Sequence, residues 1–172
     1  KFCPYFSQKG FNFGGEVGTL KHSVGIMCHR GYKPESPNQD DFFVLARDQN
    51  LLFGVLDGHG EQGHHVAHFA QQRLPKHVTE RMRNGEADWA KVATGAFKDL
   101  SDEVKKEIRD KANNAGTTAS IAWMETVPSE SSSPDGKASY RVRTAHVGDS
   151  MVVCAQRTTR TERWQVTELT NL

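Results

Sequence analysis

Short runs in which apolar and polar residues alternate recur along the chain, and they predict a fold rich in β-strands. The runs contain many β-branched and aromatic residues and are bounded by turn-forming residues, which is typical of strands. Seven runs are predicted as strands: 24–28, 42–47, 51–57, 117–124, 140–147, 151–156 and 164–169. Short strands joined by turns favour antiparallel pairing.

Two longer segments have apolar residues at helical spacing. The first spans 61–82 and the second spans 87–112. Residues three or four positions apart share one face of a helix, so each segment predicts a helix with one buried face. The apolar positions are Val66, Phe69, Ala70, Leu74, Val78 and Met82 in the first segment, and Trp89, Val92, Ala93, Ala96, Phe97, Leu100, Val104 and Ile108 in the second.

The predicted fold class is therefore α+β, with an antiparallel β-sandwich flanked by helices in α-β-β-α layers. Residues 1–22 are rich in glycine and aromatic residues without a steady period, and they predict an irregular amino-terminal arm. Residues 23–172 form the main unit. The polar, serine-rich stretch 126–139 is interpreted as a hairpin connection, because the same alternation resumes after it.

Composition narrows the possible functions. The chain has 172 residues and 36% hydrophobic residues, which suits one soluble domain with a real core. Its 22 basic and 21 acidic residues are spread along the length, so no basic patch favours nucleic acid or an anionic membrane. The longest apolar run, 51–56, is too short to span a bilayer.

The three cysteines, Cys3, Cys28 and Cys154, are far apart and form no CxxC pair. They predict neither a zinc site nor a disulfide scaffold, and they favour an intracellular location, cytoplasmic or nuclear. Cys28, Cys154 and Met151 are predicted to pack in or near the core. The chain begins at Lys1 and ends in a strand-like pattern, and we interpret it as one piece of a longer polypeptide.

Carboxylates stand at three strand ends, in NQDDF (38–42), LDGHG (56–60) and HVGDS (146–150). Residues just beyond antiparallel strand ends converge at one rim, so we expect Asp40, Asp41, Asp57 and Asp149 to approach one another. Clustered carboxylates repel unless a cation lies between them, and an all-oxygen set suits Mg²⁺ or Mn²⁺. Gly58 has no Cβ, which lets its backbone approach a metal closely.

An Asp-Gly pair after a strand is more often a simple turn than a site. His59 changes that balance, because it follows Gly58 directly at the end of an apolar strand. His64, His65 and His68 are interpreted as exposed or helix-terminal histidines without chemistry, since no further metal-binding group complements them.

Four motifs in order give a resemblance to a known family. NQDDF, LFGVLDGHG, AGTTAS (115–120) and AHVGDS (145–150) together resemble the PPM family of metal-dependent serine/threonine protein phosphatases, type 2C. The resemblance extends from about Ser23 to the end of the chain and covers the amino-terminal portion of the catalytic domain.

The resemblance implies a centre with two or more Mg²⁺ or Mn²⁺ ions that activate a water molecule. Asp57 resembles the carboxylate that bridges two ions, and Gly58 resembles the residue whose backbone oxygen binds one of them. Asp40 matches an acidic residue that holds a metal through water. Asp149 resembles the ligand of an additional metal.

The resemblance also assigns the groups around the metals. His59 resembles the general acid that protonates the leaving alcohol, and Arg30 resembles the arginine that binds the substrate phosphate. Thr118 resembles a small hydroxyl residue near the metals. Gln39 stands where many members have glutamate.

Two further acidic motifs of the family, a DGxxD element and a late Asp-Asn pair, do not occur in this sequence. We therefore expect the remainder of the catalytic domain to be required, and a naturally shortened pseudoenzyme is the alternative to a fragment. The expected function is hydrolysis of phosphoserine and phosphothreonine in phosphorylated protein substrates. One alternative is an inactive phosphatase-like fragment that binds a protein partner, and another is a metal-dependent phosphohydrolase for a small molecule.

Overall fold

The structure is a computed structural model that describes residues 24–32, 36–47, 50–127, 139–157, 159 and 161–170. Within these ranges the chain forms eight strands and three helices, which confirms the predicted α+β class. The expected arm at 1–22 and most of the serine-rich connection, residues 128–138, lie outside the described residues.

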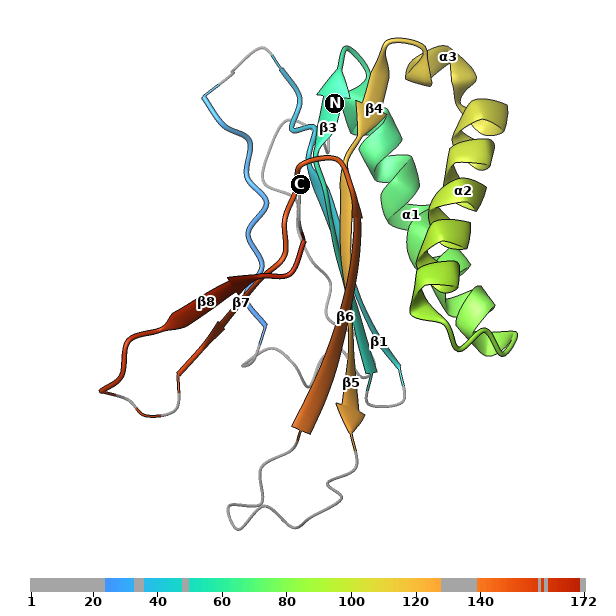
Figure 1. Cartoon of the computed structure of the whole chain (residues 1–172). Coiled ribbons are helices and arrows are strands. Elements are labelled where there is room, and N and C mark those ends of the chain that lie inside the picture. Colours follow the sequence, from blue (N-terminus) through green and yellow to red (C-terminus); the bar gives the residue numbers. More distant parts are fainter. Residues whose placement is uncertain are drawn as a thin grey trace.

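The main sheet has four antiparallel strands in the order β1-β2-β5-β6 (Figure 1). Their bounds are Asp41–Arg47 for β1, Asn50–Leu56 for β2, Ala119–Val127 for β5 and Ser139–Val147 for β6. These strands confirm four of the predicted runs. The antiparallel pairing of β5 with β6 also confirms that residues 126–139 connect the two strands of a hairpin.

A short strand pair extends this sheet at one end. Strand β3 (Gly58–Gly60) pairs with β4 (Ala115–Thr117), so that Gly58 lies opposite Thr117 and His59 opposite Gly116. Only one residue separates β2 from β3, and only one separates β4 from β5. The two ladders are therefore almost continuous, with one interruption between them.

The helices leave the sheet after β3 and return to it at β4. Helix α1 spans Gly63–Arg83, α2 spans Trp89–Glu107 and α3 spans Arg109–Ala112, and they cover one face of the sheet (Figure 1). Asp88 directly precedes helix α2 and caps it, because its side chain accepts a hydrogen bond from the Ala90 N–H. The predicted helix 87–112 is divided at Ile108, where φ of −130° leaves the helical region.

The core lies between this helical layer and the sheet. The apolar positions predicted from helical spacing supply much of it, since Val66, Ala70, Leu74 and Val78 of α1 are buried. From the sheet, Leu52, Leu56, Ile121 and Trp123 are buried against them. The end of β2 is thus anchored in the core immediately before Asp57.

The strand predicted at 24–28 is wrong, because the structure gives this segment no strand pairing. Val24 and Ile26 instead line an apolar cavity together with Phe42, Phe53 and Val55 of β1 and β2. A β-prone sequence fits a pleated apolar surface, but it becomes a strand only when another strand offers ladder hydrogen bonds. This segment therefore faces apolar side chains of the sheet across a cavity and does not join its ladder. Cys28, at its end, is buried as predicted.

The predicted burial of Met151 and Cys154 is also wrong. Strand β7 (Val153–Gln156) pairs with β8 (Gln165–Glu168), which confirms two predicted strands, but every residue of both strands is exposed. Met151 is 53% exposed, and Cys154 is exposed as well. Apolar strand residues become buried only against a second layer, and the pair extends away from the main sheet (Figure 1).

Among the helices of the described part of the chain, none combines the length and the hydropathy needed to cross a lipid bilayer.

Candidate functional site

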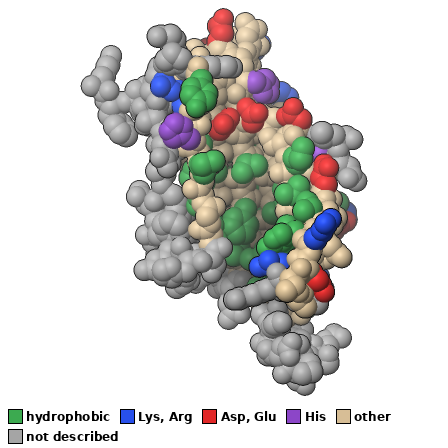
Figure 2. Space-filling view, turned by 90° about the vertical axis from the view of Figure 1, so that its left-hand side faces the viewer, with side chains coloured by type: hydrophobic (Ala, Val, Ile, Leu, Met, Phe, Trp, Pro, Cys, Tyr) green, Lys and Arg blue, Asp and Glu red, His purple; other side chains and the backbone are tan. Residues whose placement is uncertain are grey.

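The rim where β1, β2 and β5 meet β3 and β4 contains two adjoining cavities. The larger one, of about 570 Å³, is lined by side chains and backbone from residues 30–32, 36–40 and 57–60. The second, of about 370 Å³, includes Cys28 and Ser150. Asp40 and Asp57 line both cavities. Viewed on the sheet face opposite the helices, Asp and Glu side chains gather above an area of hydrophobic side chains (Figure 2).

Strand register brings Asp40 and Asp57 together. In the ladder between β1 and β2, Asp41 lies opposite Leu56. The same antiparallel register, extended by one residue, sets Asp40 opposite Asp57. The sequence prediction that acidic strand ends meet at one rim therefore agrees with the position of these two residues.

The backbone at Asp57 is held by Thr118 across the interruption between the two ladders. The Asp57 N–H donates to Thr118 Oγ1 over 3.0 Å, and the Thr118 N–H donates to the Asp57 carbonyl over 2.9 Å. Thr118 is buried, and its hydroxyl lies 2.6 Å from Ser150 Oγ. A side-chain hydroxyl thus replaces one ladder carbonyl, so the strand can turn at Asp57 without losing its hydrogen bonds.

Gly58 is packed too closely for any side chain. A Cβ at this position would lie 2.5 Å from the Gln39 carbonyl oxygen and 2.6 Å from the Gly63 carbonyl oxygen. The loop before β1, the start of β3 and the first turn of α1 therefore touch through their backbones. Gln39 Nε2 donates to the Gly60 carbonyl over 2.9 Å, a bond that a carboxylate at this position would not form.

His59 projects from β3 at the exposed side of the larger cavity. Its ring lies over Gly116 of the paired strand, where an added Cβ would be 2.7 Å from His59 Nε2. Arg30 lines the same cavity, and its Nη1 donates to the Ser36 carbonyl over 3.4 Å. The cavity therefore combines two carboxylates, an imidazole and a guanidinium.

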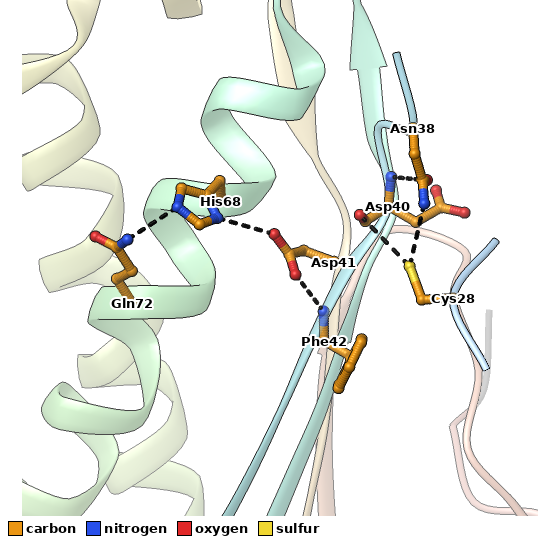
Figure 3. Close-up of polar contacts among 7 residues, drawn as sticks. All are labelled: Cys28, Asn38, Asp40, Asp41, Phe42, His68 and Gln72. Carbon is orange, nitrogen blue, oxygen red and sulfur yellow. Dashed lines mark hydrogen bonds and ion pairs between the residues drawn. The ribbon is translucent and has the colours of Figure 1, made fainter. Parts of the chain in front are cut away.

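Asp41 lines the smaller cavity together with Asp40 and Asp57, but its carboxylate is turned away from theirs, which corrects the expectation from sequence. Its carboxylate is buried, points toward α1 and lies 3.1 Å from His68 Nδ1, whereas the Asp40 carboxylate points away from α1 (Figure 3). Successive side chains of a strand point to opposite sides, so the carboxylates of two adjacent aspartates point in different directions.

Asp149 is exposed and follows Gly148, whose φ is +87°. The described residues that line the two cavities include Ser150 but not Asp149. Its role as a ligand of an additional metal stays a prediction.

The histidines near the start of α1 differ from one another. Burial lowers the pKa of His65, and the nearby Lys111 and His68 lower it further. A lowered pKa favours the neutral form of this ring at pH 7. His68 contacts Asp41, a role that sequence spacing alone does not indicate.

Sequence reasoning also missed three residues that support the rim: Asn38, Cys28 and Ser150. The Asp40 N–H donates to Asn38 Oδ1 over 3.1 Å, and the Cys28 thiol donates to the Asp40 carbonyl over 3.7 Å. The Ser150 carbonyl accepts a hydrogen bond from Ser120 Oγ. Asn38 and Ser150 lie inside the NQDDF and HVGDS motifs, and this position in the motifs could have indicated that they support the rim.

A sequence model of the family described as protein phosphatase 2C matches residues 30–168. The chain belongs to the protein phosphatase 2C family. The match covers most of the chain and contains every predicted site residue, from Arg30 to Asp149. It also agrees with the predicted α+β fold of a type 2C phosphatase domain.

Curated relatives carry the same family name. The chain is similar to "Probable protein phosphatase 2C 11" of Arabidopsis thaliana, with 28% identity over 88% of this chain and 37% of the relative. It is 30% identical to "Probable protein phosphatase 2C 35" of Arabidopsis thaliana, over 76% of this chain and 35% of the relative. A rice protein, "Probable protein phosphatase 2C 64", is 28% identical over 66% of this chain and 26% of the relative. The chain spans about a third of the length of the first two relatives.

The protein phosphatase 2C family depends on metal ions in general, and the rim contains part of a suitable set of ligands. The described residues contain no group of three or more His, Cys, Asp or Glu side chains arranged to hold a metal ion. The two carboxylates that face one cavity, Asp40 and Asp57, are nevertheless hard oxygen donors of the type that Mg²⁺ and Mn²⁺ bind. The chemical type of these donors therefore fits Mg²⁺ or Mn²⁺, and further ligands would have to complete the coordination.

Proposed function

We propose that this protein phosphatase 2C domain hydrolyses phosphoserine and phosphothreonine in phosphorylated protein substrates, as part of a complete catalytic domain. The observation that carries the proposal is one cavity lined by Asp40, Asp57, His59 and Arg30. Membership of the family supports the reaction class. The family match does not favour an inactive fragment that only binds a partner.

Asp57, Asp40 and the Gly58 carbonyl are the groups of the rim proposed to hold two or more Mg²⁺ or Mn²⁺ ions, and Asp149 is proposed to serve an additional ion. When bound, such ions supply an activated water and neutralise phosphoryl charge. The role of the chain is to keep its donors at fixed positions. The Thr118 bonds to the Asp57 backbone and the close packing around Gly58 support that role.

Arg30 is proposed to bind the phosphoryl group of the substrate. A guanidinium donates two parallel hydrogen bonds to two phosphate oxygens, which fixes the orientation as well as the position of the group. Arg30 lines the same cavity as Asp57, and its bond to the Ser36 carbonyl restrains the side chain.

His59 is proposed to donate a proton to the serine or threonine oxygen as the phosphorus–oxygen bond breaks. A general acid of this kind contributes roughly 10²- to 10⁴-fold to the rate. The ring is exposed to the cavity and rests on Gly116, so its approach to the leaving oxygen is unobstructed by a neighbouring side chain at that position. Phosphoryl transfer by this route needs no protein nucleophile.

An intracellular location, cytoplasmic or nuclear, is part of the same proposal. It is supported by the wide spacing of Cys3, Cys28 and Cys154 in the sequence, which contains no CxxC pair.

The test is Mn²⁺-dependent release of phosphate from a phosphothreonine peptide, measured with the complete gene product beside residues 1–172. We expect turnover that a chelator abolishes, and we expect Asp57→Asn to lower it at least about 10³-fold with an unchanged circular dichroism spectrum. Asp102→Asn, on the exposed side of α2, is the matched control and should keep full activity.

Substrate class is decided by the same assay with a sugar phosphate and a nucleotide in place of the peptide. A higher kcat/KM for either small molecule than for the phosphopeptide would overturn the proposed substrate. Metal-dependent turnover that survives in Asp57→Asn would overturn the proposed site.

A further inference from the structure

Asp41 and His68 join the end of β1 to helix α1 directly beside the proposed metal-binding residue Asp40. Asp41 is only 7% exposed, and its Oδ2 lies 3.1 Å from His68 Nδ1. Its Oδ1 accepts a hydrogen bond from the Phe42 N–H over 3.0 Å. A buried carboxylate is tolerated only with such partners, so this contact holds β1 firmly against α1.

The hydrogen bonds fix which nitrogen of His68 carries the proton. Gln72 Nε2 is an amide donor and lies 2.9 Å from His68 Nε2, so that ring nitrogen accepts. The proton of the neutral ring is then on Nδ1, which donates to Asp41 (Figure 3). Gln72, one turn further along α1, thereby orients the imidazole toward the strand.

Asp40 lies between the Asp41–His68 contact and a second set of hydrogen bonds, which Asn38 and Cys28 make to its backbone. On its other side, the Asp40 N–H donates to Asn38 Oδ1 and the Asp40 carbonyl accepts from the Cys28 thiol. Asn38 Nδ2 also donates to Cys28 Sγ over 3.4 Å, which closes a small network around the Asp40 backbone. With both flanking peptide groups held, the Asp40 carboxylate faces away from α1, toward the cavities that it shares with Asp57.

We propose that His68 is a positioning residue of the site, which acts through Asp41 to hold the Asp40 carboxylate opposite Asp57. This proposal rests on the proposed function, because it treats Asp40 as a metal-binding group. His68 itself lines neither of the two cavities. Residues that orient metal ligands typically change metal affinity about 10- to 100-fold when they are removed.

The test uses three variants of the complete gene product. His68→Leu removes the donor to Asp41, and His68→Asn keeps an amide donor near the position of Nδ1. His77→Leu is the matched control, because His77 lies on the same helix, 3.2 Å from the Glu103 carboxylate of α2 and away from the rim. Both leucine variants lose a histidine–carboxylate contact of α1.

The first measurement is Mn²⁺ binding followed by electron paramagnetic resonance. We expect His68→Leu to raise the Kd about 10-fold or more, His68→Asn to stay within about threefold of the wild type, and His77→Leu to stay within about twofold. An unchanged Kd in His68→Leu, or an equal increase in His77→Leu, would overturn the positioning role.

The second measurement needs no metal and separates this proposal from the proposed function. In metal-free protein, His68→Leu should displace the backbone amide resonances of Asp40 and Asp57, and His77→Leu should leave them in place. If Asp57→Asn binds Mn²⁺ as tightly as the wild type, the proposed metal site fails, and these resonances alone decide the role of His68. Unmoved Asp40 and Asp57 resonances in His68→Leu would then reject it.

Discussion

Asp57 and Thr118 lie 61 residues apart in sequence and exchange two hydrogen bonds at the interruption between the two ladders. One is an ordinary backbone bond, and the other ends on the threonine hydroxyl. The hydroxyl also contacts Ser150, which follows β6. One side chain therefore links three segments of the rim, and several effects of substitution follow from this arrangement.

Thr118→Val should destabilise the fold and weaken the site. Valine has nearly the same shape but cannot accept the part-buried hydrogen bond from the Asp57 N–H, and the loss of such a bond costs about 0.5 to 1.5 kcal/mol. For a domain of this size we expect Tm to fall by roughly 2 to 4 °C per kcal/mol. Thermal unfolding followed by circular dichroism measures the change. Thr126→Val, at an exposed position of β5, should leave Tm within about 1 °C.

Gly58→Ala should separate the elements that meet at the rim. The added Cβ would lie 2.5 and 2.6 Å from two backbone oxygens, which cannot rotate away as a side chain can. We expect a loss of about 1 to 3 kcal/mol in the free energy of unfolding together with weaker Mn²⁺ binding. Gly25→Ala is the control, because nothing lies within 4 Å of the Cβ it would add. Equal urea midpoints for the two variants would contradict the close packing at Gly58.

Gly116→Ala should lower kcat by displacing the His59 ring. The new methyl group would lie 2.7 Å from His59 Nε2, so the ring must move from its position over β4. Because the effect acts through His59, we expect it to vanish in a His59→Asn background. The measurement is kcat for all four members of this double-mutant cycle. Additive losses of activity would show that Gly116 acts independently of the ring.

Glu125→Gln should change how stability depends on pH. Burial raises the pKa of Glu125, but hydrogen bonds from Arg143, Trp123 and Arg141 outweigh it and bring the pKa below the ordinary value of 4.5. A lowered folded pKa means that the carboxylate stabilises the fold above pH 4.5 and that this contribution is lost as pH falls through the folded pKa.

We therefore expect the free energy of unfolding of the wild type to exceed that of Glu125→Gln by about 1 kcal/mol at pH 7. The difference is small because Arg141 and Arg143 are partly exposed to solvent. The gap should narrow as pH falls below 4.5 and through the lowered pKa of Glu125. Urea unfolding at pH 7 and at a series of lower pH values measures it, and a constant gap would refute the titration of Glu125.

The parts of the fold that could be predicted from sequence are those in which local pattern and tertiary contact agree. The helical spacing of Val66, Leu74 and Val78 predicted α1 because the same residues face the core. The acidic strand ends predicted the meeting of Asp40 and Asp57, because antiparallel register brings such ends together.

The incorrect or absent predictions concern features that depend on tertiary contacts, which the local sequence pattern does not reveal. Met151 and Cys154 carry apolar side chains in strand-like surroundings, yet they are exposed. Asp41 was grouped with Asp40, although the alternation of side chains along β1 sends it toward α1. The support of Asp40 by Cys28 joins residues that lie 12 positions apart in sequence, and no local pattern indicates it.

The helical excursion between β3 and β4 also has a consequence for the order of folding. The two short strands at the rim are β3 (Gly58–Gly60) and β4 (Ala115–Thr117). They pair only after the chain has closed a loop that contains both long helices. Closing a long loop costs entropy before its contacts form, whereas helices form from local contacts within about a microsecond. During refolding, helical circular dichroism should therefore return first, and the ability to bind a divalent cation should return in a later kinetic phase.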